Sequence, residues 1–496
     1  MTSLALLLTE STAQHPDRPA VRHDDRVLTY TELDGSSARA AALLDARGIT
    51  PGQAVGLMLP NVAEFAAVYY GILRAGAVVV PMNPLLKSRE VAYFLSDSGA
   101  RLLFATGMSD PHSAAGAADA GADLVVVDDG FAALLGAHEP RPGVVARADD
   151  DLAVLLYTSG TTGQPKGAEL THANLRHNAT VTATTLLELT PDDVVMGCLP
   201  FFHAFGQSCG LNAALCSGAC VTVIPRFAPA AALDVIARDR VTVFEGVPTM
   251  FSALLGHPDR SADTSSLRIG VSGGAALPVE VLRGFEAAFA TPILEGYGLS
   301  ETSPVAVFNH PHRPRKPGSI GTPVDGVQIR LLDDSGTDVE PGEIGEIAIR
   351  GHNVMRGYRN RPEATREAIP DGWFRSGDLA QQDEDGYYFI VDRKKDLIIR
   401  GGFNVYPREI EEVLYEHPAV FEAAVVGIPH PELGEEIGAA VALNAEADTD
   451  DIREFVRSRV AAYKYPRRIW VVDSLPKGPT GKVLRREVTI PAEVLS

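Results

Sequence analysis

The chain has 496 residues, more than one ordinary domain holds, so we expect two or more cores. Hydrophobic residues make up 45% and charged residues 22% of the chain, as in globular proteins, and the formal net charge is -20. This charge argues against a protein that binds nucleic acid or an anionic membrane through overall attraction. An anionic ligand must therefore be met by local basic groups.

Neither a membrane span nor a disulfide framework is indicated. No apolar run reaches the roughly 18 uninterrupted residues of a transmembrane helix, and the best candidate, 65–80, contains Arg74. The first residues lack the basic leader of a signal peptide. The four cysteines form no CxxC pair; they are Cys198, Cys209, Cys216 and Cys220. We expect buried free thiols in a reducing cytoplasm, not zinc ligands.

The first part of the chain alternates short apolar segments with helical ones. Segments 54–59, 77–80 and 124–127 are rich in β-forming residues, and helical patterns cover 32–47 and 62–74. Such alternation predicts an α/β fold with parallel sheets covered by helices on both faces.

A loop rich in glycine and hydroxyl groups follows the next predicted strand. Residues 152–157 read as a buried strand, and the sequence TSGTTGQPKG occupies 158–167. Thr171 is a suitable N-cap for a helix that runs to about residue 184. The sequence therefore predicts a strand-to-helix loop for phosphate, with close backbone approach at the glycines and positive charge from Lys166.

After about residue 322 the pattern of alternating strands and helices gives way to strands separated by turns. Segments 327–332 and 345–350 read as strands separated by turn residues. The charged run DRKKD, 392–396, lies between apolar stretches and marks a domain boundary. The remaining residues are enough for a small α/β domain.

The order YTSGTTGQPKG resembles the phosphate loop of the adenylate-forming superfamily, which contains acyl-CoA synthetases, nonribosomal peptide adenylation domains and beetle luciferases. Further motifs follow in the family's order, so the resemblance covers nearly the whole chain. It looks most like the bacterial fatty acyl-CoA synthetases. The resemblance implies a large N-terminal domain, 1–394, of stacked sheets with helices and a β-barrel-like part. It also implies a small mobile C-terminal α/β domain, 395–496.

The resemblance implies an ATP site assembled from several motifs. They are TSGTTGQPKG, SGGAAL at 272–277, EGYGLSE at 295–301, WFRSGDL at 373–379 and the start of DRKKD. Tyr297 would flank adenine, Ser300 would reach the α-phosphate, and Asp378 with Arg393 would hold the ribose. The implied ATP-binding residues are Thr158, Ser159, Gly160, Thr161, Thr162, Gly163, Lys166, Gly274, Ala275, Glu295, Gly296, Tyr297, Ser300, Asp378 and Arg393.

Glu301 would bind Mg²⁺, which prefers oxygen ligands. The family more often has threonine at the position of Ser300, but the hydroxyl is retained.

The remaining motifs would hold the acyl group and CoA. LPFFHAFG, 199–206, is similar to the acyl-pocket motif, although a lone histidine among aromatics is, by itself, more often a core residue. The resemblance implies substrate contacts at His203, Gly273 and Gly296. It implies a hinge at Lys395 and CoA contacts at Gly401 and Gly402. In PKGPTGKVLRRE, 476–487, Lys482 would be the catalytic lysine of adenylation, with His203 beside the reacting carboxylate.

A basic segment accompanies these motifs. From 457 to 486 the chain has nine basic residues and one acidic residue. In a protein of net charge -20 this segment is the expected partner of the CoA phosphates.

The resemblance implies an ATP-dependent acid–CoA ligase that forms acyl-AMP and pyrophosphate and then an acyl-CoA. Amino-acid adenylation domains usually carry an aspartate where this chain has His203, Ala204 and Phe205, so an amino acid is disfavoured. No extra segment lies between the magnesium and ribose motifs, which favours CoA over a carrier protein. The apolar, small-residue stretch 199–219 favours a medium- to long-chain fatty acid.

Several alternatives stay open from the sequence. They are an aryl or bulky apolar acid, an acyl carrier protein as acceptor, a luciferase, and a non-catalytic nucleotide-binding protein. A degenerate binding protein should lose Lys482, Glu301 or Asp378 before core residues, and all three are present.

Overall fold

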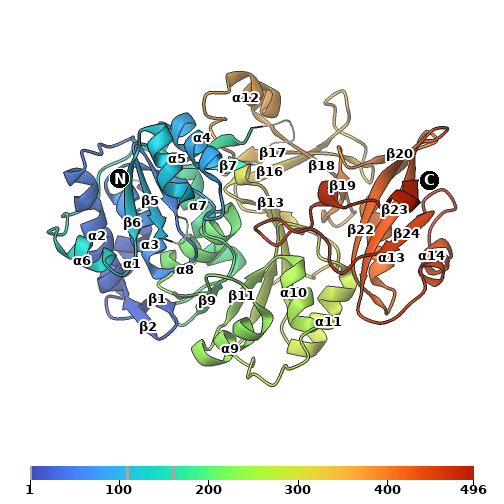
Figure 1. The fold of residues 1–496 in the computed structure, drawn as a ribbon, viewed down its shortest axis with the longest axis horizontal. Coiled ribbons are helices and arrows are strands. Elements are labelled where there is room, and N and C mark those ends of the chain that lie inside the picture. Colours follow the sequence, from blue (N-terminus) through green and yellow to red (C-terminus); the bar gives the residue numbers. More distant parts are fainter. Residues whose placement is uncertain (1–2, 108–110, 159–163, 496) are drawn as a thin grey trace.

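In the computed structural model, the described residues, 3–107, 111–158 and 164–495, form four β-sheets with helices packed on them (Figure 1). Going along the chain, a six-stranded and a nine-stranded sheet are followed by a four-stranded sheet and a five-stranded C-terminal sheet. The mixed α/β class and the division into a large first part and a smaller last part agree with the prediction.

The six-stranded sheet has the order β6-β5-β3-β4-β7-β8. Its strands are β3 (Ala54–Met58), β4 (Val78–Pro81), β5 (Leu102–Thr106), β6 (Asp123–Val127), β7 (Leu152–Thr158) and β8 (Lys166–Thr171). All neighbours are parallel except β7 and β8. The covering helices are α2 (Tyr30–Ala46), α3 (Ala63–Arg74), α4 (Ser88–Ser98), α5 (His112–Ala120) and α6 (Phe131–Gly136).

Side chains of β3 divide between two cores, as expected for a sheet covered on both faces. Val55 and Leu57 belong to the large core with α2 and α3, whereas Ala54 and Met58 pack with the residues of α4. The predicted strands and helices of this region are confirmed within one or two residues at their ends.

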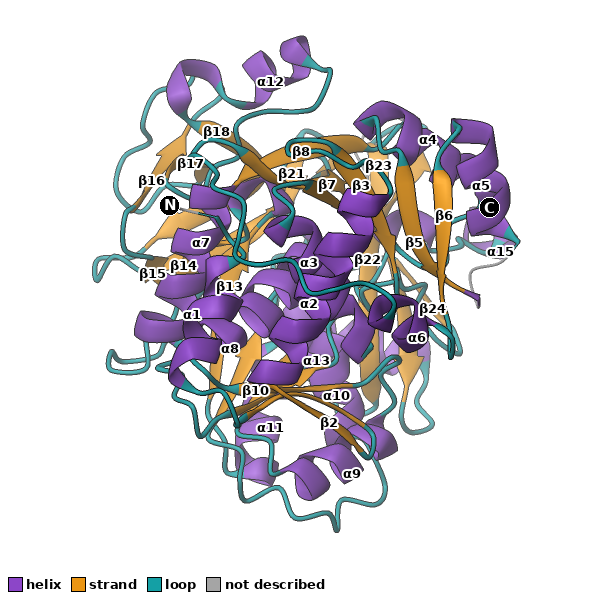
Figure 2. Ribbon diagram, turned by 90° about the vertical axis from the view of Figure 1, so that its left-hand side faces the viewer, coloured by secondary structure: helices purple, strands orange, loops and turns teal. Residues whose placement is uncertain are grey.

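The nine-stranded sheet has the order β15-β14-β13-β12-β11-β9-β10-β1-β2. Its strands are β1 (Pro19–His23), β2 (Arg26–Thr29), β9 (Val194–Gly197), β10 (Cys220–Val223), β11 (Val243–Gly246), β12 (Ile269–Ser272), β13 (Ile293–Gly298), β14 (Val305–Phe308) and β15 (Thr322–Pro323). Its helices are α1 (Leu6–Gln14), α7 (His172–Val181), α8 (Ala213–Cys216), α9 (Pro229–Asp239), α10 (Pro248–Leu255) and α11 (Val279–Phe289). Figure 2 shows α1, α2, α3 and α8 gathered between the strands of the two large sheets.

The last third of the chain forms two smaller sheets. The antiparallel four-stranded sheet, in the place of the expected β-barrel-like part, consists of β16 (Val327–Leu332), β17 (Gly345–Gly351), β18 (Phe374–Gln382) and β19 (Tyr388–Arg393), with α12 (Pro362–Ala368) nearby. The C-terminal sheet consists of β20 (Ile398–Arg400), β21 (Phe403–Val405), β22 (Val420–His430), β23 (Gly434–Leu443) and β24 (Arg468–Val471). Its helices are α13 (Pro407–Tyr415), α14 (Thr449–Arg457) and α15 (Ala492–Leu495).

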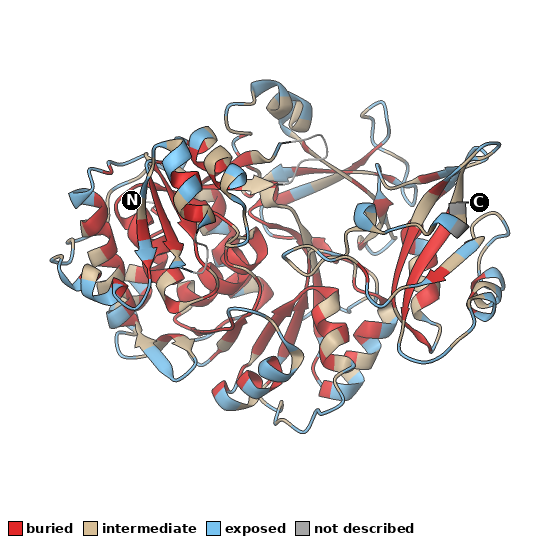
Figure 3. Ribbon diagram, in the orientation of Figure 1, coloured by how far each residue is buried: buried red, intermediate tan, exposed pale blue. Residues whose placement is uncertain are grey.

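The C-terminal sheet has its own buried side chains. One cluster runs from Ile398 to Val456 and a second contains Trp470 and Leu475, and both are separate from the large core. Figure 3 shows the corresponding band of buried residues in the C-terminal sheet. A division of the chain near residue 395 accords with these clusters, and the limits 1–394 and 395–496 stay a prediction.

One local prediction was wrong: the glycine-rich loop does not lead straight into a helix. β7 pairs in antiparallel fashion with β8, with Thr158 opposite Lys166, so the connecting segment joins two strands of a hairpin. Residues Lys166–Thr171 form the edge strand of the sheet through backbone hydrogen bonds with β7. The helix therefore begins only at His172. Thr171 is the N-cap as predicted, with Asn174 completing a capping box.

Two further expectations concern the middle of the chain. α7 continues as a π-helical segment, η2 (Thr182–Leu186), so the helix extends about as far as predicted.

The four cysteines are free thiols, three of them buried and Cys216 half-buried. Within the described ranges, no helix is long and apolar enough to span a bilayer.

Candidate active site

Asp378 is held between Tyr297 and Arg393 by neighbouring elements. The Tyr297 hydroxyl, from β13, donates to Asp378 Oδ2 at 2.6 Å, and Arg393 Nε lies 3.2 Å from Oδ1. The register of β18 and β19 places Asp378 directly opposite Arg393. Burial raises the pKa of Asp378, whereas Arg393 and Lys482 oppose that shift. The carboxylate is therefore fixed in orientation and available to accept further hydrogen bonds.

Lys482, near the C-terminal end of the chain, lies close enough for its charge to act on Asp378. Its loop is closed by a hydrogen bond from the Gly478 N–H to the Lys482 carbonyl, at 2.8 Å. The Thr249 hydroxyl donates to the Gly481 carbonyl at 2.8 Å and so docks the loop on α10. Burial and the nearby Arg393 lower the pKa of Lys482 to about 8, against the effect of Asp378.

Gly274 makes room for the lysine. A Cβ at this position would lie 2.6 Å from Lys482 Cε and 3.1 Å from Nζ. The backbone of Gly274 also has φ +82°, which L side chains rarely adopt. The same loop carries the exposed Ala275, so the SGGAAL segment lies beside the lysine, and its predicted contacts with adenine and the acyl group stay a prediction.

Glu301 lies at the centre of a second group of polar side chains. It lies in a single 3₁₀ turn after β13, next to Ser300. Its Oε1 accepts hydrogen bonds from the Tyr358 hydroxyl at 2.9 Å and from the Thr158 hydroxyl at 3.4 Å. Lys166 Nζ lies 5.1 Å from the centroid of the Tyr358 ring. Thr158, Lys166, Ser300 and Glu301 are thus brought into one region.

Five predicted phosphate contacts cannot be placed. They are Ser159, Gly160, Thr161, Thr162 and Gly163, which lie outside the described residues.

Tyr358 is a site residue that the sequence did not reveal. The segment 356–359 runs beside β8, with hydrogen bonds from the Glu169 N–H to the Gly357 carbonyl at 2.9 Å and from the Arg359 N–H to the Gly167 carbonyl at 2.7 Å. This pairing places the tyrosine between Glu301 and Lys166. No motif marks it, because its role depends on a contact between two distant segments.

The donor set around Glu301 suits Mg²⁺ bound together with phosphate. Across the ranges that the structure describes, no three His, Cys, Asp or Glu residues form a metal cage. One carboxylate with two neighbouring hydroxyls is the kind of site at which Mg²⁺ keeps its waters and takes substrate phosphate oxygens. Glu301 therefore fits the ion as an auxiliary ligand.

His203 lies near Lys482 and is not fully enclosed in the core. It is half-buried, and its Nδ1 accepts a hydrogen bond from the Phe205 N–H at 3.3 Å. Burial and the positive charge of Lys482 lower the pKa of His203 to about 3. The imidazole is therefore neutral, with its proton on Nε2, and it lies close enough to Lys482 to feel its charge.

Two glycines of the predicted substrate site are packed against aromatic rings. A Cβ on Gly273 would lie 3.0 Å from a ring carbon of Phe205, and one on Gly296 would lie 2.6 Å from the Phe308 ring. Gly273 thus lets Phe205 close over the strand end beside His203.

Glu295 supports the loop 272–277 from beneath. Its Oε1 accepts the Leu277 N–H at 3.0 Å, and burial raises its pKa to about 7. Its side chain lines a small cavity together with Leu282 and Glu286 of α11, so its predicted contact with ATP stays a prediction.

The predicted CoA residues are not at this site in the observed arrangement. Gly401 and Gly402 form the exposed turn between β20 and β21, with φ of +56° and +83°. Lys395 lies in the turn between β19 and β20.

Several basic side chains of segment 457–486 form ion pairs with carboxylates. Lys464 pairs with Glu409, Lys477 with Glu422, and Arg485 with both Glu411 and Asp392. Much of the segment's charge is thus compensated by neighbouring carboxylates, which the run of residues alone could not reveal.

Comparison with known proteins accounts for this constellation. Residues 8–359 match the family model of the AMP-binding enzymes, and residues 409–482 match the model of the AMP-binding enzyme C-terminal domain. The chain therefore belongs to the AMP-binding, adenylate-forming enzyme family. Within that family its relatives are named CoA ligases and synthetases, and the chain is an AMP-forming acyl-CoA synthetase by class.

Individual relatives differ in the acid that they are named for. Feruloyl-CoA synthase of Amycolatopsis sp. is 41% identical, with 95% of this chain and 96% of the relative covered. Long-chain-fatty-acid–CoA ligase of Bacillus subtilis (strain 168) is 36% identical, covering 98% and 94%. The crystal structure of an anthranilate CoA ligase in complex with anthranoyl-AMP has a TM-score of 0.93 at 30% identity, covering 98% of this chain and 96% of that one.

Proposed function

We propose that the protein activates a carboxylic acid with ATP and Mg²⁺ and transfers the acyl group to coenzyme A. The observation that carries the proposal is the seating of Lys482 against Gly274, where its charge acts on both Asp378 and His203, two residues from distant parts of the chain. Family membership supports the same reaction.

In the first step, an oxygen of the substrate carboxylate attacks the α-phosphorus of ATP, and pyrophosphate leaves. Asp378 accepts hydrogen bonds from the ribose hydroxyls, and Tyr297 with Arg393 holds it for that task. Lys482 supplies positive charge where the attacking and leaving oxygens crowd the phosphorus. Neutral His203 donates its Nε2 hydrogen to the acid without adding charge. Mg²⁺ on Glu301 would neutralise charge on the phosphates.

In the second step, the sulfur of CoA attacks the acyl carbonyl, and the carbon–oxygen bond to AMP breaks. Lys482 occupies the site in the observed arrangement, which suits the first step. We propose that the C-terminal domain, 395–496, turns about Lys395, withdraws Lys482 and brings Gly401 and Gly402 to the thiol path. This is a hinge motion between two productive states.

The acid has an apolar body in this proposal. The stretch 199–219 contributes apolar and small side chains, and relatives named for long-chain fatty acids and for ferulate both fit such a body. A medium- to long-chain fatty acid is the first candidate from the sequence. We place the enzyme in the cytoplasm, with CoA as acceptor and no role for nucleic acid.

The test is to incubate the purified protein with ATP, Mg²⁺ and a panel of acids, with and without CoA. The panel runs from acetate to palmitate and includes benzoate, cinnamate, ferulate and amino acids. AMP release and the mass of the product are followed. CoA-dependent acyl-CoA with at least one acid supports the proposal. Acyl-AMP that accumulates regardless of CoA points to another acceptor, and no AMP with any acid contradicts the proposal.

A further inference from the structure

Glu245 is a buried carboxyl group to which the reaction above assigns no task. It lies on β11 and is 1% exposed. Neither Oε1 nor Oε2 has a hydrogen-bond partner among the residues that the structure describes. Burial alone raises the pKa of the Glu245 carboxyl to about 8. A buried carboxyl without partners is costly, so it calls for an explanation.

Alternation along β11 shows which way the side chain points. Phe244 packs against Phe251 and Phe285, from α10 and α11, on one face of the sheet. Glu245 and Val247 therefore point to the opposite face. Val247 lies 3.5 Å from the position of a Cβ on Gly274, where Lys482 is held. Glu245 thus lies on the face of the acyl site, two residues and about 6 to 7 Å deeper than Val247.

The neighbouring strand agrees with this direction. Glu245 is paired with Val271 on β12, and Gly273, two residues further along, faces the ring of Phe205. An acyl group that starts at His203 and passes Phe205 and Gly273 into the protein would run along this face toward Glu245.

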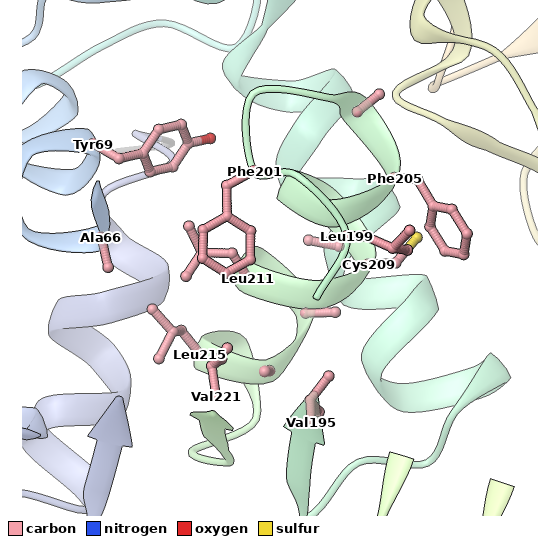
Figure 4. Packing of buried hydrophobic residues seen from close by; sticks show 14 of the residues in the cluster. Ala66, Tyr69, Val195, Leu199, Phe201, Phe205, Cys209, Leu211, Leu215 and Val221 are labelled. Atoms are coloured by element: carbon pink, nitrogen blue, oxygen red, sulfur yellow. The ribbon is translucent and has the colours of Figure 1, made fainter. Parts of the chain in front are cut away.

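The π-helical segment η3 (Gly206–Asn212) lies at the end of this path, next to Glu245. A Cβ on Gly210 would lie only 3.1 Å from Glu245 Oε2, so glycine gives the carboxyl its space there. Cys209 and Cys198 are its other neighbours, and the Cys198 thiol donates to the backbone carbonyl of Glu245 at 3.3 Å. Figure 4 shows Phe205 and Cys209 projecting from the same side of this helix. No basic side chain pairs with Glu245 among the described residues.

We propose that Glu245 is a specificity-determining residue that binds a hydroxyl group at the far end of the acid substrate. The inference rests on the proposed function. An apolar chain end would leave the carboxyl buried and unpartnered, whereas a substrate hydroxyl gives it a hydrogen bond. Two kinds of acid carry such a group: hydroxyaryl acids and alkyl acids with a terminal hydroxyl. A plain fatty acid carries none.

The experiment compares matched pairs of acids on the full-length protein. The pairs are para-hydroxycinnamate with cinnamate and omega-hydroxydodecanoate with dodecanoate. The readout is kcat/KM for CoA-dependent AMP release. We expect one hydroxylated acid to be favoured by about 100-fold, because a site that binds a hydroxyl leaves its own polar group unpaired with the analogue. The pair that shows this preference identifies the kind of acid.

Three variants tie the preference to Glu245. Glu245→Leu should reduce the preference to below about tenfold, mainly through a higher kcat/KM for the plain acid. Glu245→Gln retains a hydrogen-bonding group of the same size and should keep most of the preference. Asp239→Asn, a buried and paired carboxylate at the end of α9, is the matched control and should change neither acid. Thermal melting checks that each variant is folded.

Equal kcat/KM for both members of both pairs overturns the inference, as does a preference that survives Glu245→Leu. A stronger preference for para-aminocinnamate than for the hydroxyl compound overturns the choice of a hydroxyl. If Glu245→Leu does not fold, Gly210→Ala crowds the same carboxyl and should weaken the preference. Failure of every acid to release AMP contradicts the proposed function itself, which keeps the two failures distinct.

Discussion

Carboxyl groups on the proposed nucleotide side of the site have hydrogen-bond partners in the protein, whereas the carboxyl group on the proposed acyl side has none among the described residues. Asp378 receives the Tyr297 hydroxyl and the Arg393 guanidinium, and Glu301 receives the Tyr358 and Thr158 hydroxyls. Glu245 has no side-chain partner among the described residues. The groups that would meet ATP, which every turnover uses, are fixed in advance by the protein. Glu245, which would meet the acid substrate, has no hydrogen-bond partner for its carboxyl group within the described part of the chain, so the acid itself would have to supply one.

The electrostatic surroundings follow the same division. Burial raises the pKa of both Asp378 and Glu245, but only at Asp378 do Arg393, Lys395 and Lys482 oppose the shift. A charged carboxylate suits two ribose hydroxyls, and a protonated carboxyl suits a neutral partner in an apolar setting. Substitutions on the nucleotide side test whether this difference matters for the reaction.

The largest effect is expected from Lys482→Ala. The change removes the charge nearest the reacting phosphate, so acyl-AMP formation should fall by about 100- to 1,000-fold or more. Thioester formation from supplied acyl-AMP should stay largely intact, because the proposed mechanism withdraws this lysine for the second step. Acid-dependent ATP–pyrophosphate exchange measures the first step, and acyl-CoA formation from synthetic acyl-AMP measures the second.

Lys477→Ala is the control for that loop, because Lys477 pairs with Glu422 inside the small domain and not with the site. Lys395→Pro should have the reverse effect, with adenylation kept and thioester formation lost. No backbone hydrogen bond from the Lys395 N–H is found in the described part of the chain, so proline there restricts the hinge without breaking a contact. Loss of both half-reactions in Lys482→Ala would contradict the alternation of the two domains.

A smaller loss is expected from Asp378→Asn. The neutral side chain weakens the bonds to both ribose hydroxyls and leaves Arg393 without its charge partner. Hydrogen bonds to charged groups contribute about 1.5–3 kcal/mol, so kcat/KM for ATP should fall by about 10- to 100-fold. The affinity for the acid should change little. Asp338→Asn, at the exposed pair with Arg330, is the control, and an unchanged kcat/KM for ATP in Asp378→Asn would remove this residue from the ribose site.

The sequence predicted the features that depend on local order. The strands of the first sheet and the N-cap at Thr171 follow from pattern, and motif order singled out Asp378 and Arg393, which the structure finds opposite each other on β18 and β19. The β7–β8 hairpin was missed because Lys166–Thr171 forms a strand only by pairing with its neighbour. Tyr358 and Glu245 were missed for the same kind of reason. Each is a single side chain, and its role depends on the partners that it has, or lacks, in the folded chain.

The pH profile tests the lysine without removing it. Burial and Arg393 lower the pKa of Lys482 to about 8, so the side chain is charged below that pH and loses its proton as the pH rises. The value of kcat/KM for adenylation, which reports the free enzyme, should therefore fall about tenfold per pH unit above about 8. Lys482→Arg keeps its charge throughout, so the alkaline fall should be absent from its remaining activity. A flat wild-type profile up to strongly alkaline pH would contradict the role of the charged lysine.

The smallest effect is expected from Tyr358→Phe, which alters only the support of Glu301. The ring and its contact with Lys166 stay, but the hydroxyl that lies 2.9 Å from Glu301 Oε1 is lost. Groups that orient a metal ligand influence metal affinity, so the Mg²⁺ concentration for half-maximal adenylation should rise by about tenfold or less. At saturating Mg²⁺ the rate should be close to that of the unaltered protein. Tyr387→Phe, which loses a hydroxyl bonded to the Pro314 carbonyl and not to Glu301, is the matched control. An identical Mg²⁺ dependence in both variants would mean that Glu301 needs no fixed orientation, and the contrast with Glu245 would then rest on Asp378 alone.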